Sequence, residues 1–208
     1  ALPEQARAIY FDAPGQDGMP LVFSLEVDPA TLDASDFEVT TQDGRTFEVA
    51  AATLRPASEA FELRTVLLIG EYGNHPDNPP TAVRVVGDLK SRTGVNLKGA
   101  RAPVIPLEAG PILSYAEYFA WTETERKAGC DCPNGTKMVV KAVWAGGVRA
   151  LDGSELGDAE RGKFAITLVA GSDTAVVTPF QLADLADNDN NTDLCLDVDR
   201  RQLLGGGL

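Results

Sequence analysis

Histidine is nearly absent from this chain of 208 residues, which contains only His75. A catalytic triad built on serine or cysteine normally uses a histidine base. His75 lies in the polar stretch 73–78, where we expect it to face solvent. The chain also has no G-x-S-x-G sequence, the motif that carries the nucleophile of many hydrolases. Nucleophilic catalysis is therefore disfavoured.

Basic residues are also scarce, since 18 Lys and Arg stand against 31 Asp and Glu, giving a formal net charge of −13 and a pI near 4.4. Nucleic acids and anionic membrane surfaces bind clusters of Lys and Arg. The composition therefore excludes nucleic acid as a partner. Cations, neutral glycans and protein ligands remain as candidates.

Long apolar runs are missing, and the longest apolar cluster is Val66-Leu67-Leu68-Ile69. A membrane-spanning helix needs about 20 predominantly apolar residues, so we expect no membrane insertion. The sequence opens with Ala1-Leu2-Pro3, which is typical of the residues left after a signal peptide is removed. We therefore expect a secreted, periplasmic or cell-surface protein.

Proline and glycine are plentiful, with 13 and 20 residues, and such frequent interruption keeps helices short. Asp43-Gly44 predicts a hairpin turn, because glycine adopts a positive φ without steric cost. Segments rich in β-branched and aromatic residues predict strands in the first half; they are 21–25, 37–40, 46–49, 65–69 and 83–86. The expected fold class is all-β, with two tandem antiparallel β-sandwich domains.

Turn and core residues of the first half resemble the opening half of bacterial Ig-like domains found in surface-layer and adhesion proteins. These residues are Phe23-Ser24, Val27-Asp28-Pro29, Thr31-Leu32, Ser35-Asp36-Phe37, Val39 and Asp43-Gly44. Val86-Gly87-Asp88-Leu89 and Thr93-Gly94-Val95-Asn96-Leu97 are similar to the closing segment of those domains. The resemblance covers about residues 8–105 and implies a seven-stranded sandwich that acts as a spacer or binding module, without a reaction.

Prolines and glycines between 103 and 111 predict a linker, because proline cannot continue a strand ladder. We place the boundary near Gly110, which gives an Ig-like domain at 1–110 and a second β-rich domain at 111–208. Segment 112–121 fits either a strand or a short helix. Further strands are expected in the second domain; they are 136–144, 163–169 and 175–178.

An oxygen-rich run near the end of the chain places Asp187, Asp189, Asn191 and Asp193 at alternating positions. Calcium loops present oxygen ligands at such spacing, so the run predicts a calcium site. The standard helix-loop-helix form lacks its glycine and its final glutamate here, so the geometry would differ. The alternative is a solvated loop in which Asp and Asn side chains cap their own backbone.

Cysteine occurs three times, at Cys130, Cys132 and Cys195. In the strand expected at 194–199, leucine and valine share one face, and Cys195 lies on the other face with the aspartates. An exposed thiol there would oxidise, so we expect a disulfide to Cys132 in preference to Cys130. Zinc held by three thiolates is the alternative, but a fourth ligand is missing, because His75 belongs to the other domain.

Aromatic side chains concentrate in the second half, where Tyr118, Trp121 and Trp144 are candidates for stacking on a neutral glycan. Their alternative role is to fill the second core. Together these features predict a non-enzymatic exported or cell-surface β-sandwich protein, acting as a binding, adhesion or spacer module and stabilised by calcium. The alternative is a hydrolase or lyase that acts on polysaccharide with Asp and Glu as acid and base.

Overall fold

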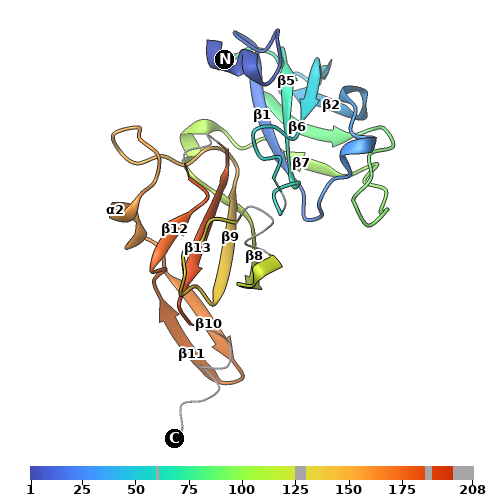
Figure 1. The fold of residues 1–208 in the computed structure, drawn as a ribbon. Coiled ribbons are helices and arrows are strands. Elements are labelled where there is room, and N and C mark those ends of the chain that lie inside the picture. Colours follow the sequence, from blue (N-terminus) through green and yellow to red (C-terminus); the bar gives the residue numbers. More distant parts are fainter. Residues whose placement is uncertain (60, 125–129, 186–188, 199–208) are drawn as a thin grey trace, which may run out of the picture. The chain divides into compact units, whose positions relative to one another are not determined.

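The computed structural model describes residues 1–59, 61–124, 130–185 and 189–198, and they form an all-β protein (Figure 1). The predicted fold class is confirmed, because antiparallel sheets supply most of the regular structure and helix α2 (Asp158–Arg161) has only four residues. No helix in these ranges has the length and apolar character needed to cross a membrane. Four short 3₁₀ helices are also present among the described residues: η1 (Glu4–Ala8), η2 (Pro29–Thr31), η3 (Ala34–Asp36) and η4 (Leu107–Ala109).

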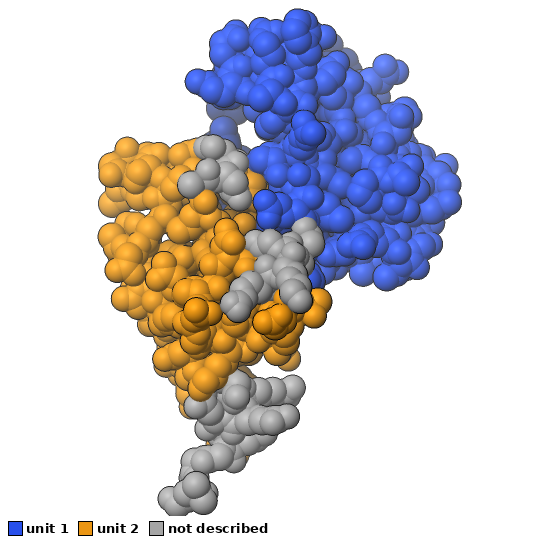
Figure 2. Space-filling model, viewed as in Figure 1, with its two compact units in different colours: residues 1–112 blue, residues 113–208 orange. Residues whose placement is uncertain are grey.

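The chain divides into two compact units, residues 1–112 and residues 113–208, which Figure 2 shows in different colours. The division falls close to Gly110, in the segment where proline and glycine predict a linker.

Unit 1 (residues 1–112) contains two antiparallel sheets, with strand orders β1-β5-β4 and β3-β2-β6-β7. The strands are β1 (Asp17–Val22), β2 (Phe37–Thr41), β3 (Thr46–Glu48), β4 (Ala51–Thr53), β5 (Thr65–Gly70), β6 (Pro80–Val85) and β7 (Arg101–Pro103). One buried cluster joins Val39 and Val83 of the second sheet to Val66 and Leu68 of the first. The two sheets therefore share a core, as in a sandwich.

The predicted turn at Asp43-Gly44 is confirmed. Strands β2 and β3 pair in antiparallel fashion on either side of it, with Val39 opposite Phe47. Gly44 has a φ of +82°, a backbone conformation that is sterically unfavourable for residues with a Cβ atom.

Unit 2 (residues 113–208) contains a four-stranded antiparallel sheet of order β12-β13-β9-β8 and a two-stranded ribbon, β10-β11. The strands are β8 (Leu113–Ala120), β9 (Met138–Trp144), β10 (Ile166–Ala170), β11 (Asp173–Val177), β12 (Gln181–Ala183) and β13 (Asn191–Leu196). Segment 112–121, which fits a strand or a helix by sequence, is therefore strand β8. Its exposed and half-buried residues alternate from Ser114 onward, as the pleat of a strand requires.

Strand β13 differs from the sequence expectation of a half-buried strand at 194–199. It begins at Asn191, and every residue from Asn191 to Leu196 is buried. The reason is its central position, between β12 and β9, with side chains packed on both faces. One face packs in a cluster that contains Cys130 and Val139, and the other packs against Leu156 and Leu182. Cys195 therefore faces a second core and not solvent.

Candidate functional site: a buried charged cluster beside a disulfide

Cys132 and Cys195 form a disulfide across 63 positions of the sequence, with the Cα atoms 5.8 Å apart. The predicted pairing is confirmed, and Cys130 is left as a buried free thiol. Cys195 comes from the middle of the sheet, and Cys132 comes from the segment that leads into β9. The bond therefore ties this segment to the central strand of unit 2.

Lys141 is the unexpected member of this region. It lies on β9 within the otherwise apolar stretch Met138–Trp144, and its side chain is only 2% exposed. Its Nζ atom lies 2.9 Å from Oδ2 of Asp184 and 3.0 Å from Oδ1 of Asp193. A buried ammonium group needs anions beside it, because removing its charge from water costs several kcal/mol unless opposite charges compensate it. Two carboxylates supply that pairing here.

Strand pairing explains how Asp193 reaches this lysine. Asp193 on β13 lies directly opposite Lys141 on β9, and directly opposite residues of an antiparallel pair have Cβ atoms about 5 Å apart. Asp184 reaches it from the segment after β12, in a left-handed conformation with a φ of +61°. A non-glycine residue in that region is strained by about 1 to 3 kcal/mol. The ion pair with Lys141 stabilises Asp184 in this backbone conformation.

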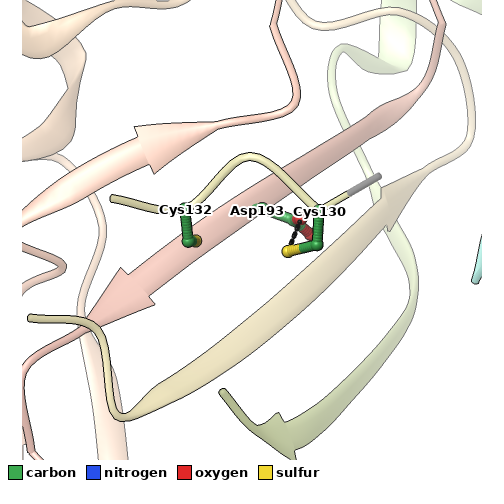
Figure 3. Close-up of side chains that lie close together, drawn as sticks. All are labelled: Cys130, Cys132 and Asp193. Atoms are coloured by element: carbon green, nitrogen blue, oxygen red, sulfur yellow. Dashed lines mark hydrogen bonds between the residues drawn. The ribbon is translucent and has the colours of Figure 1, made fainter. Parts of the chain in front are cut away.

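Asp193 also binds the free thiol. Sγ of Cys130 donates a hydrogen bond to Oδ2 of Asp193 at 2.9 Å (Figure 3). The carboxylate therefore has one oxygen directed to Lys141 and the other to Cys130. Burial raises the pKa of Asp193, and the neighbouring Lys141 charge works in the opposite direction. Burial, together with the charge of Asp193, raises the pKa of the Cys130 thiol, which is therefore protonated at neutral pH.

The predicted calcium ligands form contacts with different residues. Asp187 lies outside the described residues, and Asp193 belongs to the Lys141 and Cys130 contacts. Asp189 accepts hydrogen bonds from the backbone N and from Nδ2 of Asn191, both at 2.7 Å. The structure therefore brings Asp189 and Asn191 together, in the Asx geometry that was the alternative to calcium.

The three aromatic candidates lie in different surroundings. Tyr118 on β8 is 63% exposed. Trp121 is half-buried against the cluster that contains the disulfide. Trp144 packs edge-on against Phe164 at 6.3 Å, and its Nε1 donates to Oγ1 of Thr192 at 3.3 Å. Trp121 and Trp144 therefore pack on opposite faces of the sheet, and the three side chains do not form a single platform.

Sequence reasoning missed Lys141 and Asp184. A signal was present for the first, because a single lysine interrupts the run Met138-Val139-Val140-Lys141-Ala142-Val143, where a central strand would bury it. No local signal marks Asp184. Its role depends on a partner that lies 43 positions away in the sequence.

Comparison of the chain with protein-family models, with curated protein sequences and with solved structures gives no match in any of the three.

Proposed function

We propose that this chain is a non-enzymatic exported or cell-surface protein that acts as a binding, adhesion or spacer module. The observation that carries the proposal is the buried disulfide between Cys132 and Cys195. Disulfides persist in oxidising environments outside the cytoplasm and are rare in the reducing cytosol. This bond lies in the core of unit 2, where its loss would affect the whole unit.

The strand order supports an Ig-like identity for unit 1. Immunoglobulin sandwiches pair strands B, E and D in one sheet and C′, C, F and G in the other. The orders β1-β5-β4 and β3-β2-β6-β7 correspond to this arrangement if β1 is strand B and β7 is strand G. Such domains commonly serve as spacers and binding modules, which is the role proposed here.

The burial of the charged cluster supports a structural role over a catalytic one. The side chains of Lys141, Asp184 and Asp193 are 2%, 10% and 0% exposed. A polysaccharide chain cannot reach groups that are withdrawn from solvent to this degree. Their charges instead pair with one another inside unit 2.

Calcium is proposed as a stabilising ion near Asp189. Carboxylate oxygens of Asp184 and Asp189 lie within 4.8 Å of each other. Oδ1 of Asn191 is buried and accepts no hydrogen bond from the described part of the chain. Calcium binds carboxylate and amide oxygens of this kind. An excess of chelator should then lower the melting temperature, and Asp189→Asn should remove that response. An unchanged melting temperature would overturn the calcium proposal.

A neutral glycan or a protein is the proposed ligand, because the net charge of −13 disfavours anions. The test combines localisation with binding. We expect fractionation of the producing organism to place the chain outside the cytoplasm, and a panel of neutral glycans and surface proteins to show binding without turnover. Recovery from the cytoplasm would overturn the export proposal. Turnover of a polysaccharide that an Asp→Asn variant abolishes would favour the hydrolase or lyase alternative.

A further inference from the structure

We propose that Cys130, Cys132, Cys195 and Asp193 bind one zinc ion in the state of the chain that precedes disulfide formation. The donor atoms of Cys130, Cys132 and Asp193 lie within 4.8 Å of one another, and all three residues are buried (Figure 3). Sγ of Cys195 adjoins this group, because it is bonded to Sγ of Cys132. Three sulfurs and one carboxylate oxygen thus gather in one buried place.

The four donors have the types and the number that zinc requires. Zinc is bound in proteins by cysteine sulfur, histidine nitrogen and Asp or Glu oxygen, and its structural sites are tetrahedral and closed. With Zn–S near 2.3 Å and Zn–O near 2.1 Å, neighbouring ligand atoms lie about 3.5 to 3.8 Å apart. Histidine cannot be the fourth ligand, because the one histidine of the chain, His75, belongs to unit 1. The structure supplies Asp193 in that position.

Strand geometry keeps two of the donors on one side of the sheet. Asp193 and Cys195 are separated by two positions on β13, so their side chains point to the same face. Cys130 and Cys132 approach that face from the segment before β9 (Figure 3). The site therefore takes two ligands from a rigid strand and two from the segment that the disulfide later fixes.

Lys141 binds the oxygen of the Asp193 carboxylate that is not directed to the sulfurs. Oδ2 of Asp193 is directed to Cys130, on the side of the sulfurs, and Oδ1 lies 3.0 Å from Nζ of Lys141. One oxygen is thus available to the ion, while the other is held by a positive charge. Partners of this kind orient metal ligands and tune their affinity. Lys141 also offsets part of the negative charge of three thiolates and a carboxylate.

Zinc binding and the disulfide are alternative states of the same residues. When the ion binds, the three thiols release three protons and no electron moves. When the disulfide forms from the zinc-bound state, the thiolates of Cys132 and Cys195 give two electrons to an oxidant of the disulfide class, which takes two protons from solvent and becomes two thiols. The Cys130 thiolate takes up the third proton. The ion then loses two of its four ligands and leaves. The newly made chain, whose cysteines are thiols, is the form that binds zinc.

The test uses cobalt(II) as a spectroscopic probe on the full chain. The chain is reduced with a phosphine, the phosphine is removed under anaerobic conditions, and cobalt is added. We expect one cobalt per chain, with thiolate-to-metal charge-transfer absorption and the visible bands of a tetrahedral site, followed by displacement with zinc. The oxidised chain should show none of these bands.

Variants separate this site from adventitious binding. Cys130→Ser keeps the disulfide pair but removes one sulfur, and Asp193→Asn replaces the carboxylate; each should weaken cobalt binding at least tenfold. His75→Ala is the matched control and should leave binding unchanged. Equal affinity of the reduced wild type and Cys130→Ser would overturn the proposal, as would an octahedral spectrum typical of oxygen ligands.

A folding measurement covers the case in which the reduced chain is unstable. We expect zinc to raise the melting temperature of the reduced full chain and to leave that of the oxidised full chain unchanged, because the ion stabilises only the state that binds it. A reduced chain that is unfolded and remains unfolded in excess zinc would contradict the proposal.

Discussion

Lys141 and Asp193 lie directly opposite each other on β9 and β13, with Nζ 3.0 Å from Oδ1 and both side chains withdrawn from solvent. This pair, with Asp184 and Cys130 beside it, occupies the face of the sheet on which the disulfide also lies. The central strand of unit 2 therefore carries one covalent and one ionic connection to its neighbours. Both make unit 2 sensitive to single substitutions.

Replacing the lysine tests the ionic connection. Lys141→Met leaves Asp184 and Asp193 buried without a cation, and breaking a buried pair in this way costs about 3 to 5 kcal/mol. We expect a drop of this size in the free energy of unfolding, measured by urea denaturation. Lys90→Met is the control, because the Lys90–Asp88 pair is solvent-exposed and such pairs contribute about 0 to 1 kcal/mol. Equal effects of the two substitutions would contradict this account of Lys141.

Removing the disulfide tests the covalent connection. Cys132→Ala and Cys195→Ala should each lower the free energy of unfolding by about 2 to 4 kcal/mol, because the bond restricts a long loop of the unfolded chain. Cys130→Ser retains the bond and a donor for Asp193, so a much smaller change is expected. The measurement is chemical denaturation without reductant. A larger loss in Cys130→Ser than in Cys132→Ala would indicate a different pairing.

The sequence predicts the strands that depend on local residue pattern, but it does not predict those that depend on pairing with residues far away in the chain. Strands β2, β5 and β9 follow from alternation and β-branched residues, which are local properties. Strands β4 and β7 have three residues each and exist only because β5 and β6 lie beside them. No local pattern could predict them.

The candidate site shows the same limit. The choice of Cys132 over Cys130 as the partner of Cys195 is predicted correctly. The burial of Cys195 is not predicted. The alternation of apolar and polar residues along a strand shows which side chains share a face, but it does not show whether other residues cover that face. The ion pair of Lys141 with Asp184 joins a residue of β9 to a residue in the segment that follows β12. Only the paired sheet brings them together.

The turn between β2 and β3 makes a prediction about pH. Hydrogen bonds from the Thr41 hydroxyl and the Arg45 backbone N–H lower the pKa of Asp43 to about 2. The stabilisation from Asp43 is therefore present above the pKa of the unfolded chain, about 3.9, and is lost as the pH falls toward 2. The melting temperatures of the wild type and Asp43→Asn should differ at pH 7 and converge at pH 2. An NMR titration that gives Asp43 a pKa near 3.9 would contradict this.

The aromatic candidates can be separated by paired substitutions. Tyr118→Ala removes an exposed ring, so we expect an unchanged melting temperature and weaker glycan binding, measured by calorimetry with any glycan found in the binding screen. Trp121→Ala removes a ring packed near the disulfide and should lower the free energy of unfolding by about 3 kcal/mol. Full glycan affinity in Tyr118→Ala would exclude this ring from the binding surface.

Thiol mapping of the protein taken from the cells that make it shows directly whether the chain carries the buried disulfide that export to an oxidising environment would form. The chain is unfolded without reductant in the presence of an alkylating reagent, and its intact mass and disulfide-linked peptides are measured. We expect one alkylated cysteine, Cys130, and a peptide that joins Cys132 to Cys195. Three alkylated cysteines, or a peptide that joins Cys130 to Cys195, would contradict the account.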